Sequence, residues 1–451
     1  MKFKQKRELI LNGKLTKTIL TVSLPIMLNN LIQTLFNLTD TWFIGRLPGN
    51  KIASIAFVWP IIFFLMAIGI GVSMAGTGLI SQYLGSNQIK KAKKISGQII
   101  LFAFSFSTIF GIIGSLLSHT ILSQFISGDL LKYANQYLEI MFLGMPSLFL
   151  MFAYRSIKRG EGDTYTPMKI TAFAVVTNII LDPIFMFSLN LGVKGAAYAT
   201  VLSRFVWGIF ALNTLFKDTN ELKLSIKDLK FNKNLMTELT KVGIPASIGQ
   251  SSAAIGFLVL NNFIVSFGQT TLTAFTLGNR ISSLIMMPAM GIGNAIAPIV
   301  GQNLGADQIK RAKESIKKSV SLTTLFLVIG GSILLYFSEG ILKLFTKDLE
   351  ILNQGLPYLR LITLSLPLMG YFQILNGIFQ GSGHTKSAMF LMAGRLWGLR
   401  IPLIIIFKNF TNLGSLGIWY AMILSNFLIV FIGFLIYKTG KWENKIIKSK
   451  I

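Results

Sequence analysis

Four polar residues interrupt the first long apolar segment of the chain, and the last of them is a carboxylate. Asn30, Gln33, Asn37 and Asp40 are spaced three, four and three residues apart, so on a helix they lie along one face. Such a stripe does not face lipid; it lines a cavity or forms a hydrogen-bonded seam with another helix. For Asp40 the seam is the weaker interpretation, because a carboxylate in an apolar environment needs a proton, a cation or an arginine.

A second carboxylate, Asp182, lies in another apolar segment. Asn178 precedes it by four residues and so shares its helical face, and Pro183 follows it, which loosens the helix and frees backbone carbonyl groups. Carboxylate, amide and hydroxyl oxygens together form an all-oxygen set that suits a hard monovalent cation such as Na⁺. Without a cation, the two carboxylates would share a proton. The residues leave the choice between Na⁺ and H⁺ as the coupling ion open.

The second half of the chain has a different set of polar residues. Its apolar segments contain no Asp or Glu away from their ends, and Gln250, Gln373 and Asn376 are neutral candidates for lining a cavity. Arg400 lies in the middle of a segment, where it either attracts an anionic group or satisfies backbone carbonyl groups. Other arginines, such as Arg204, we assign to snorkelling near segment ends.

The composition places all these residues in a membrane protein. The chain has 451 residues, of which 52% are hydrophobic and 13% charged, about half the charge of a typical soluble protein. It has no cysteine and two histidines, which excludes thiol chemistry and most histidine-based enzyme designs. The net charge of +26 indicates lysine-rich loops beside anionic lipids rather than nucleic-acid binding. We expect no cofactor.

Apolar runs between charged or Gly/Pro-rich breaks predict twelve transmembrane helices. They cover residues 18–44, 53–80, 96–118, 134–156, 168–188, 195–216, 242–267, 272–300, 319–338, 355–379, 388–407 and 415–437. The N-terminal segment and every second loop hold 31 of the 43 Lys and Arg residues, and the opposite loops hold 7. The positive-inside rule therefore predicts that both termini are cytoplasmic.

This topology sets the depth of the polar residues. Asp40, Asp182 and Thr200 each lie four to six residues from the outer end of their predicted span. At about 1.5 Å per residue, all three are about 6–9 Å below the outer helix ends. They converge if the helix faces that carry them meet, which predicts a cation- or proton-binding site at Asp40, Asn178, Asp182 and Thr200.

The chain also repeats itself at an offset of about 220 residues. Residues 82–93 match residues 302–313 at 8 of 12 positions, and Pro25 pairs with Pro245. An even number of spans per repeat makes the repeats parallel. We therefore expect an all-α polytopic protein with two six-helix lobes around a central cavity. The predicted lobes cover 1–216 and 242–451, joined by a cytoplasmic linker at 217–241; Pro25 is either a hinge or an ordinary helix kink.

With these motifs the sequence resembles the multidrug and toxic compound extrusion (MATE) family. The resemblance rests on Leu24-Pro25, on Asp40-Thr-Trp-Phe-Ile-Gly45, and on Gln-x-Leu-Gly and Gly-x-Gly-x-Thr motifs in both halves. It implies a V-shaped pair of bundles and export driven by Na⁺ or H⁺. It also implies an ion site at the four residues above. The lack of carboxylates in the seventh and tenth spans makes the chain more similar to the DinF-like than to the NorM-type branch.

The sequence therefore predicts a secondary active efflux transporter. The expected substrates are organic cations or amphipathic compounds. We expect the protein in the plasma membrane, in contact with its lipids, and as a monomer. A lipid or lipid-linked oligosaccharide flippase of the same superfamily is the alternative. The sequence contains no catalytic constellation that would indicate an enzyme. Carboxylates confined to one lobe indicate a binding site rather than the conduction ring of an ion channel.

Overall fold

The computed structural model describes residues 3–217 and 222–447, and these residues form helices and connecting turns without a strand. Ten helices are long and apolar enough to cross a membrane, and two bent helix pairs bring the number to twelve. The predicted all-α polytopic architecture is therefore confirmed. Residues 218–221 of the predicted linker lie outside the described residues.

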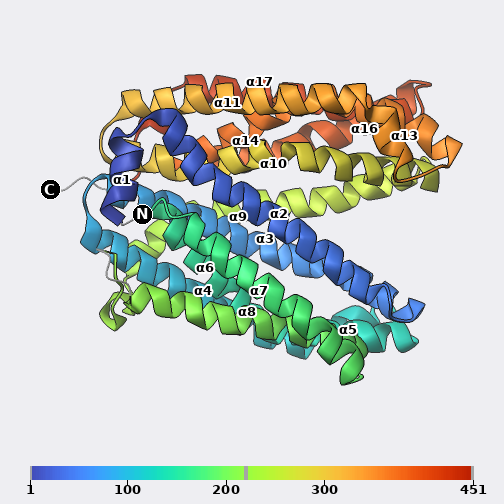
Figure 1. Cartoon of the computed structure of the whole chain (residues 1–451), viewed down its shortest axis with the longest axis horizontal. Coiled ribbons are helices and arrows are strands. Elements are labelled where there is room, and N and C mark those ends of the chain that lie inside the picture. Colours follow the sequence, from blue (N-terminus) through green and yellow to red (C-terminus); the bar gives the residue numbers. More distant parts are fainter. Residues whose placement is uncertain (1–2, 218–221, 448–451) are drawn as a thin grey trace.

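The helices fall into a first and a second half of the chain (Figure 1). The first half comprises α1 (Phe3–Asn12), α2 (Leu15–Ile44), α3 (Gly49–Gly85), α4 (Ile89–Ser123), α5 (Gly128–Leu143), α6 (Met145–Gly160), α7 (Tyr165–Pro183) with the π-helix η1 (Ile184–Ser188), and α8 (Gly192–Lys217). After the 3-10 turn η2 (Ile226–Leu229), the second half comprises α9 (Lys233–Val265), α10 (Gln269–Gly305), α11 (Ile309–Tyr336), α12 (Ser338–Lys343), α13 (Leu349–Leu364), α14 (Leu366–Gly381), α15 (Thr385–Ala393), the π-helix η3 (Gly394–Arg400), α16 (Ile401–Phe410), α17 (Ser415–Lys438) and the turn η4 (Lys441–Glu443).

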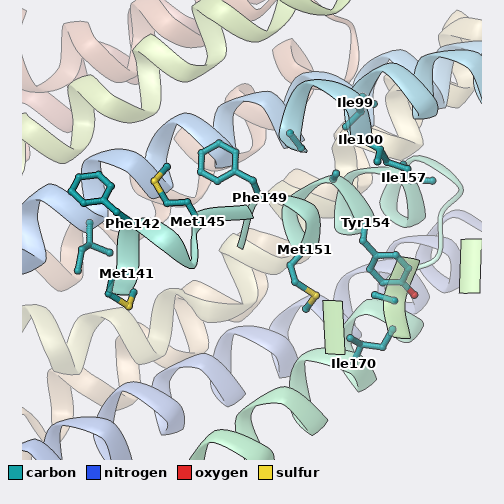
Figure 2. Packing of buried hydrophobic residues seen from close by; sticks show 14 of the residues in the cluster. Ile99, Ile100, Met141, Phe142, Met145, Phe149, Met151, Tyr154, Ile157 and Ile170 are labelled. Carbon is teal, nitrogen blue, oxygen red and sulfur yellow. The ribbon is translucent and has the colours of Figure 1, made fainter. Parts of the chain in front are cut away.

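The fourth and tenth spans are bent. The pair α5 and α6 bends by 46° and the pair α13 and α14 by 50°. Pro146 and Pro367 stand just after the two bends, and a proline leaves the carbonyl group one turn earlier without its helical partner. Around the first bend, Phe142, Met145 and Phe149 pack in the apolar core of the first half (Figure 2).

The two halves meet at the end of the molecule where both termini lie, and they diverge toward the other end (Figure 1). At the meeting end the repeated glutamines reach across between halves. Gln82 Nε2 donates to the Gly381 carbonyl at 3.1 Å, and Gln302 Nε2 donates to the Gly160 carbonyl at 2.9 Å. The Gln-x-Leu-Gly motif of each half thus binds the Gly-x-Gly-x-Thr motif of the other.

The threonine of each Gly-x-Gly-x-Thr motif binds the first long helix of its own half. Thr164 Oγ1 donates to the Val22 carbonyl at 2.9 Å, and Thr385 Oγ1 donates to the Val242 carbonyl at 2.7 Å. Each of these carbonyl groups lies three residues before the proline inside α2 or α9. The repeated motif therefore holds the segment around that proline in the same way in both halves.

Replacing Thr164 by Val keeps the side chain's shape and removes this hydroxyl. We expect a loss of about 1–2 kcal/mol of stability, seen as a lower melting temperature in detergent when tryptophan fluorescence is followed. Thr385→Val is expected to behave alike. Thr273→Val is the matched control, because its exposed hydroxyl bonds only within its own helix. Equal melting temperatures for Thr164→Val and the control would contradict the role assigned to the motif.

The turn between α6 and α7 holds a buried acidic group. Glu161 is 2% exposed and pairs with Lys158 at 3.2 Å, while its neighbour Asp163 pairs with Lys6 of α1 at 2.6 Å. Burial raises the pKa of the Glu161 carboxyl from its ordinary value of 4.5 to about 7, against the opposing effect of the Lys158 ammonium. The folded protein therefore keeps this proton to a higher pH than the unfolded chain does.

This shift predicts a pH dependence of stability. Because the folded state binds the proton more tightly, stability contributed by protonated Glu161 is present below pH 4.5 and is lost as the pH rises to about 7. The melting temperature of the wild type is expected to fall over this interval by more than that of Glu161→Gln, which cannot ionise. Glu139→Gln, at an exposed position, should keep the wild-type slope. A slope unchanged in Glu161→Gln would refute the assignment.

Candidate ion site in the first half

Three of the predicted site residues meet in the interior of the first half. Asp182 and Asn178 lie one turn apart on α7, and Thr200 approaches them from the neighbouring helix α8. All three are buried, with Asp182 0% exposed, Asn178 1% and Thr200 4%. Pro183 ends the regular part of α7 directly after Asp182, and η1 follows it. Asp182 therefore stands at the point where the helix loses its regular hydrogen bonds.

Asn178 joins the other two residues. Its Nδ2 group lies 3.3 Å from Asp182 Oδ1 and 3.5 Å from Thr200 Oγ1. With the amide turned over, Nδ2 donates to Asp182 Oδ2 at 3.1 Å and Oδ1 accepts from the Thr200 backbone N–H at 3.2 Å, which satisfies both ends of the amide. In either orientation Asn178 bridges the Asp182 carboxylate and α8.

Asp40 approaches this group from α2. Its charge interacts with those of Asp182 and of the Arg204 guanidinium, and the buried Tyr137 hydroxyl lies close enough to interact with all three. The Asp40 carboxyl makes no hydrogen bond or ion pair with any residue in the ranges 3–217 and 222–447. The structure thus brings Asp182, Asn178 and Thr200 into contact and leaves Asp40 at electrostatic range.

A cavity of about 60 Å³ opens beside these residues. The rest of its wall is apolar, and its polar lining comes from seven residues: Gln33, Arg155, Thr171, Asn178, Thr200, Ser203 and Arg204. A space of this volume has room for a few water molecules or one partly hydrated ion. It is far smaller than the roughly 300–1,000 Å³ of pockets for drug-sized molecules.

Two arginines and a tyrosine of this site were missed from the sequence. Arg204 was assigned to snorkelling, but it lies near the middle of α8 and lines the cavity. Arg155 stands at the inner end of the predicted span 134–156 and was not proposed as a site residue; it lies in α6, lines the same cavity and donates to Thr171 Oγ1 at 3.0 Å. Tyr137 carried no charge or motif to mark it. The sequence did contain a sign that Arg204 is a site residue: it lies far from both ends of its predicted span, so its side chain cannot easily reach the membrane surface.

The other predicted residues of α2 do not all face this cavity. Gln33 lines it, the Asn30 Nδ2 group is buried and has no partner among the described residues, and Asn37 is exposed. Pro25 is buried inside α2, which runs as one helix through it. Of the four stripe residues only Asn37 is exposed, while Asp40, one turn further on, is again half-buried beside the site. The hinge role of Pro25 stays a prediction.

The predicted cavity-lining residues of the second half lie elsewhere. Gln250 Nε2 lies 3.0 Å from Met74 Sδ, across the boundary between the halves. Asn376 is buried and donates to the Phe372 carbonyl of its own helix at 2.9 Å, and Gln373 packs beside α10, against Gly293. Arg400 is 7% exposed and is held within the second half. These side chains form no common group with Asp182.

The chemistry of the first-half site suits a monovalent cation or a proton. The described residues contain no group of three or more His, Cys, Asp or Glu side chains that could hold a metal ion. The site offers two carboxylates, a hydroxyl and an amide oxygen. The Arg204 guanidinium lies at electrostatic range of Asp40, and the Arg155 guanidinium lines the same cavity. Asp40, Asp182 and Arg204 together carry a single negative charge, which one bound positive charge would balance. Arg155 is bonded to Thr171 instead, and its charge interacts with those of Arg159 and Arg204.

A family model and two curated relatives match most of the chain. The family model described as MatE matches residues 25–184 and 245–406, which is more than half of the chain. The chain is 29% identical to the "Probable multidrug resistance protein YoeA" of Bacillus subtilis, over 88% of this chain and 87% of the relative. It is 27% identical to the "Probable multidrug resistance protein NorM" of Thermotoga maritima, over 97% and 95%.

Solved structures share the fold. The chain is similar to the structure described as "Outward-facing conformation of a multidrug resistance MATE family transporter of the MOP superfamily", with a TM-score of 0.90 and 24% sequence identity. The likeness covers 95% of this chain and 96% of that one. At this identity the match supports the two-repeat helical fold and nothing finer.

Proposed function

The chain belongs to the MatE family, and we propose that it is a secondary active multidrug efflux transporter. It exports organic cations or amphipathic compounds in exchange for Na⁺ or H⁺ by alternating access. The names of its relatives, which are multidrug resistance proteins, support drug efflux. The observation that carries the coupling mechanism is the buried contact of Asp182, Asn178 and Thr200, with Asp40 at electrostatic range.

In the proposed mechanism, ion binding changes the charge of a desolvated site. Empty, the two carboxylates repel each other and are only partly balanced by Arg204. A sodium ion or a proton removes that repulsion and draws α2 toward α7 and α8. Because α2 also packs against α10 of the second half, its movement changes the packing between the two halves. The release of substrate is then coupled to the uptake of the ion.

The finer assignments follow the same reasoning. We place the ion site in the first half, as in the DinF-like branch, because the second half's spans lack Asp and Glu. The loop charges support a plasma-membrane protein with both termini in the cytoplasm, and we expect a monomer. The flippase alternative is not favoured, since the relatives reported above are named for multidrug resistance.

Transport by purified protein in liposomes tests the proposal. Efflux of a fluorescent organic cation is followed under an imposed Na⁺ gradient and then under a pH gradient. We expect one gradient to drive transport and Asp40→Asn to lower that rate by about tenfold or more. The effective gradient identifies the ion. Folded protein that transports under neither gradient would refute the proposed function, and full activity of Asp40→Asn would remove Asp40 from the coupling site.

A further inference from the structure

The second half contains counterparts of the residues that surround the first-half ion site. Residues 202–205, Leu-Ser-Arg-Phe, correspond to residues 424–427, Leu-Ser-Asn-Phe, and residues 137–138 correspond to residues 358–359, both Tyr-Leu. The offsets are those of the repeat. Ser203, Arg204 and Tyr137 of the first half therefore have Ser425, Asn426 and Tyr358 as their equivalents.

Arg400 contacts these counterparts. Its Nε group donates to Ser425 Oγ at 3.1 Å, and its Nη2 group donates to Asn426 Oδ1 at 2.6 Å. Its charge also interacts with the buried Tyr358. Where the first half gathers carboxylates beside the equivalent residues, the second half gathers a cation that is 7% exposed.

A second arginine, Arg395, lies close to Arg400. Counted from the equivalent residues Thr164 and Thr385, Arg395 stands where the first half has Ala174, a residue of the cavity wall. Its Nη1 group lies 3.1 Å from Met369 Sδ, and its guanidinium lies 4.3 Å from the centre of the Phe372 ring. Its Nε group is buried and has no acceptor among the described residues.

The π-helix η3 is what sets the two arginines on a common face. Residues five apart lie one above the other in a π-helix, whereas in an α-helix they point in different directions. Arg395 and Arg400 are five apart and both lie in η3. They are close enough for their charges to repel each other.

Among residues 3–217 and 222–447, no carboxylate forms an ion pair with either of these arginines. The spans of the second half contain no Asp or Glu away from their ends, and the partners found for the two guanidiniums are neutral: two hydroxyls, an amide oxygen, a thioether and an aromatic ring. A buried charge without an opposite charge is costly. Guanidinium groups bind carboxylate and phosphate groups through paired hydrogen bonds, and Arg395 still has a free buried donor.

We propose that Arg395 and Arg400 form an anion-binding site in the second half, with the charge of the first-half site reversed, which takes a carboxylate or phosphate group. The group comes either from a transported compound or from a membrane phospholipid. The proposed anion site is independent of which ion binds in the first half, so its test can fail without refuting the proposed coupling mechanism, and the reverse.

Thermal unfolding of the full chain in lipid-depleted detergent tests the site. Sodium acetate and sodium phosphate are titrated against sodium chloride at equal ionic strength. We expect a saturable rise in melting temperature of about 2 °C or more in the wild type that Arg395→Gln lacks. Salt effects on the whole surface are the same in both proteins and cancel. Arg395→Lys keeps the charge and should retain part of the rise, which separates loss of the site from a general folding defect.

A second arm distinguishes the source of the group. Native mass spectrometry is performed after addition of phosphatidylglycerol, with diacylglycerol as the lipid that lacks a phosphate. More phosphatidylglycerol retained by the wild type than by Arg395→Gln, with diacylglycerol equal, assigns the site to a lipid phosphate. Stabilisation by acetate without this lipid difference assigns it to a carboxylate compound. If neither the salts nor the lipid distinguish wild type from Arg395→Gln, the anion site is refuted.

Discussion

Gradient-driven efflux is expected to fall by about ten- to a hundredfold when Asp182 is replaced by Asn. A loss of this size corresponds to the typical coupling free energy between two ligands of one protein, about 1–3 kcal/mol. Asn has nearly the same shape, so the buried contact with Asn178, which in turn reaches Thr200, can persist. The substitution removes one of the two carboxylates and with it the excess negative charge of the site. Of the three charges that interact here, Asp40 and Arg204 remain and balance each other without an ion, so the attraction for an added positive charge is lost.

The measurement separates coupling from substrate binding. Efflux is compared in liposomes with and without the gradient, and the affinity for the fluorescent substrate is measured on the purified protein. We expect Asp182→Asn to bind substrate with nearly wild-type affinity and to show the same slow transport under both conditions. Asp129→Asn, an exposed carboxylate at the start of α5, is the control and should transport normally. Undiminished gradient-driven efflux in Asp182→Asn would exclude Asp182 from the coupling site.

The central part of this site was predictable because its geometry is local. A spacing of four residues places Asn178 and Asp182 on one helical face whatever the rest of the protein does, and the apolar lengths of the spans fix the depth of Thr200. Arg204 was misjudged although its depth was equally available. Its side chain could have reached lipid, water or the cavity, and only the packing of α8 against its neighbours decides among these.

Other features depend on contacts that no local pattern contains. The repeated glutamines were recognised as a motif, but Gln82 finds its partner at Gly381, in the opposite half of the chain. The π-helix η3 has no signature in its sequence comparable to a proline, yet it aligns Arg395 with Arg400. The bends beside Pro146 and Pro367, by contrast, follow from the missing N–H group and could have been drawn from the sequence.

The meeting end of the two halves is expected to open when Gly85 is replaced by Ala. A Cβ atom at Gly85 would collide with the Gln302 carbonyl, and one at Gly305 would collide in the same way with the Gln82 carbonyl. Both obstacles are backbone atoms, so the strain cannot be relieved by turning a side chain. Overpacking of this kind costs about 1–3 kcal/mol. Because it is felt only while the halves touch, it shifts the population toward the separated state by roughly ten- to a hundredfold.

A cysteine placed in this interface reports the opening, and the chain has no other cysteine. Ser81 is fully buried against Gly301, so Ser81→Cys alone should react slowly with a maleimide. In the Gly85→Ala background its labelling is expected to be about tenfold faster or more, with efflux reduced because the halves no longer close at this end. Gly340→Ala is the matched control, since a Cβ there meets nothing within 4 Å. Labelling that stays slow in folded Gly85→Ala protein would show that the glycine contact does not limit the separation of the halves, and the seal would then have to rest on the crossed glutamine bonds.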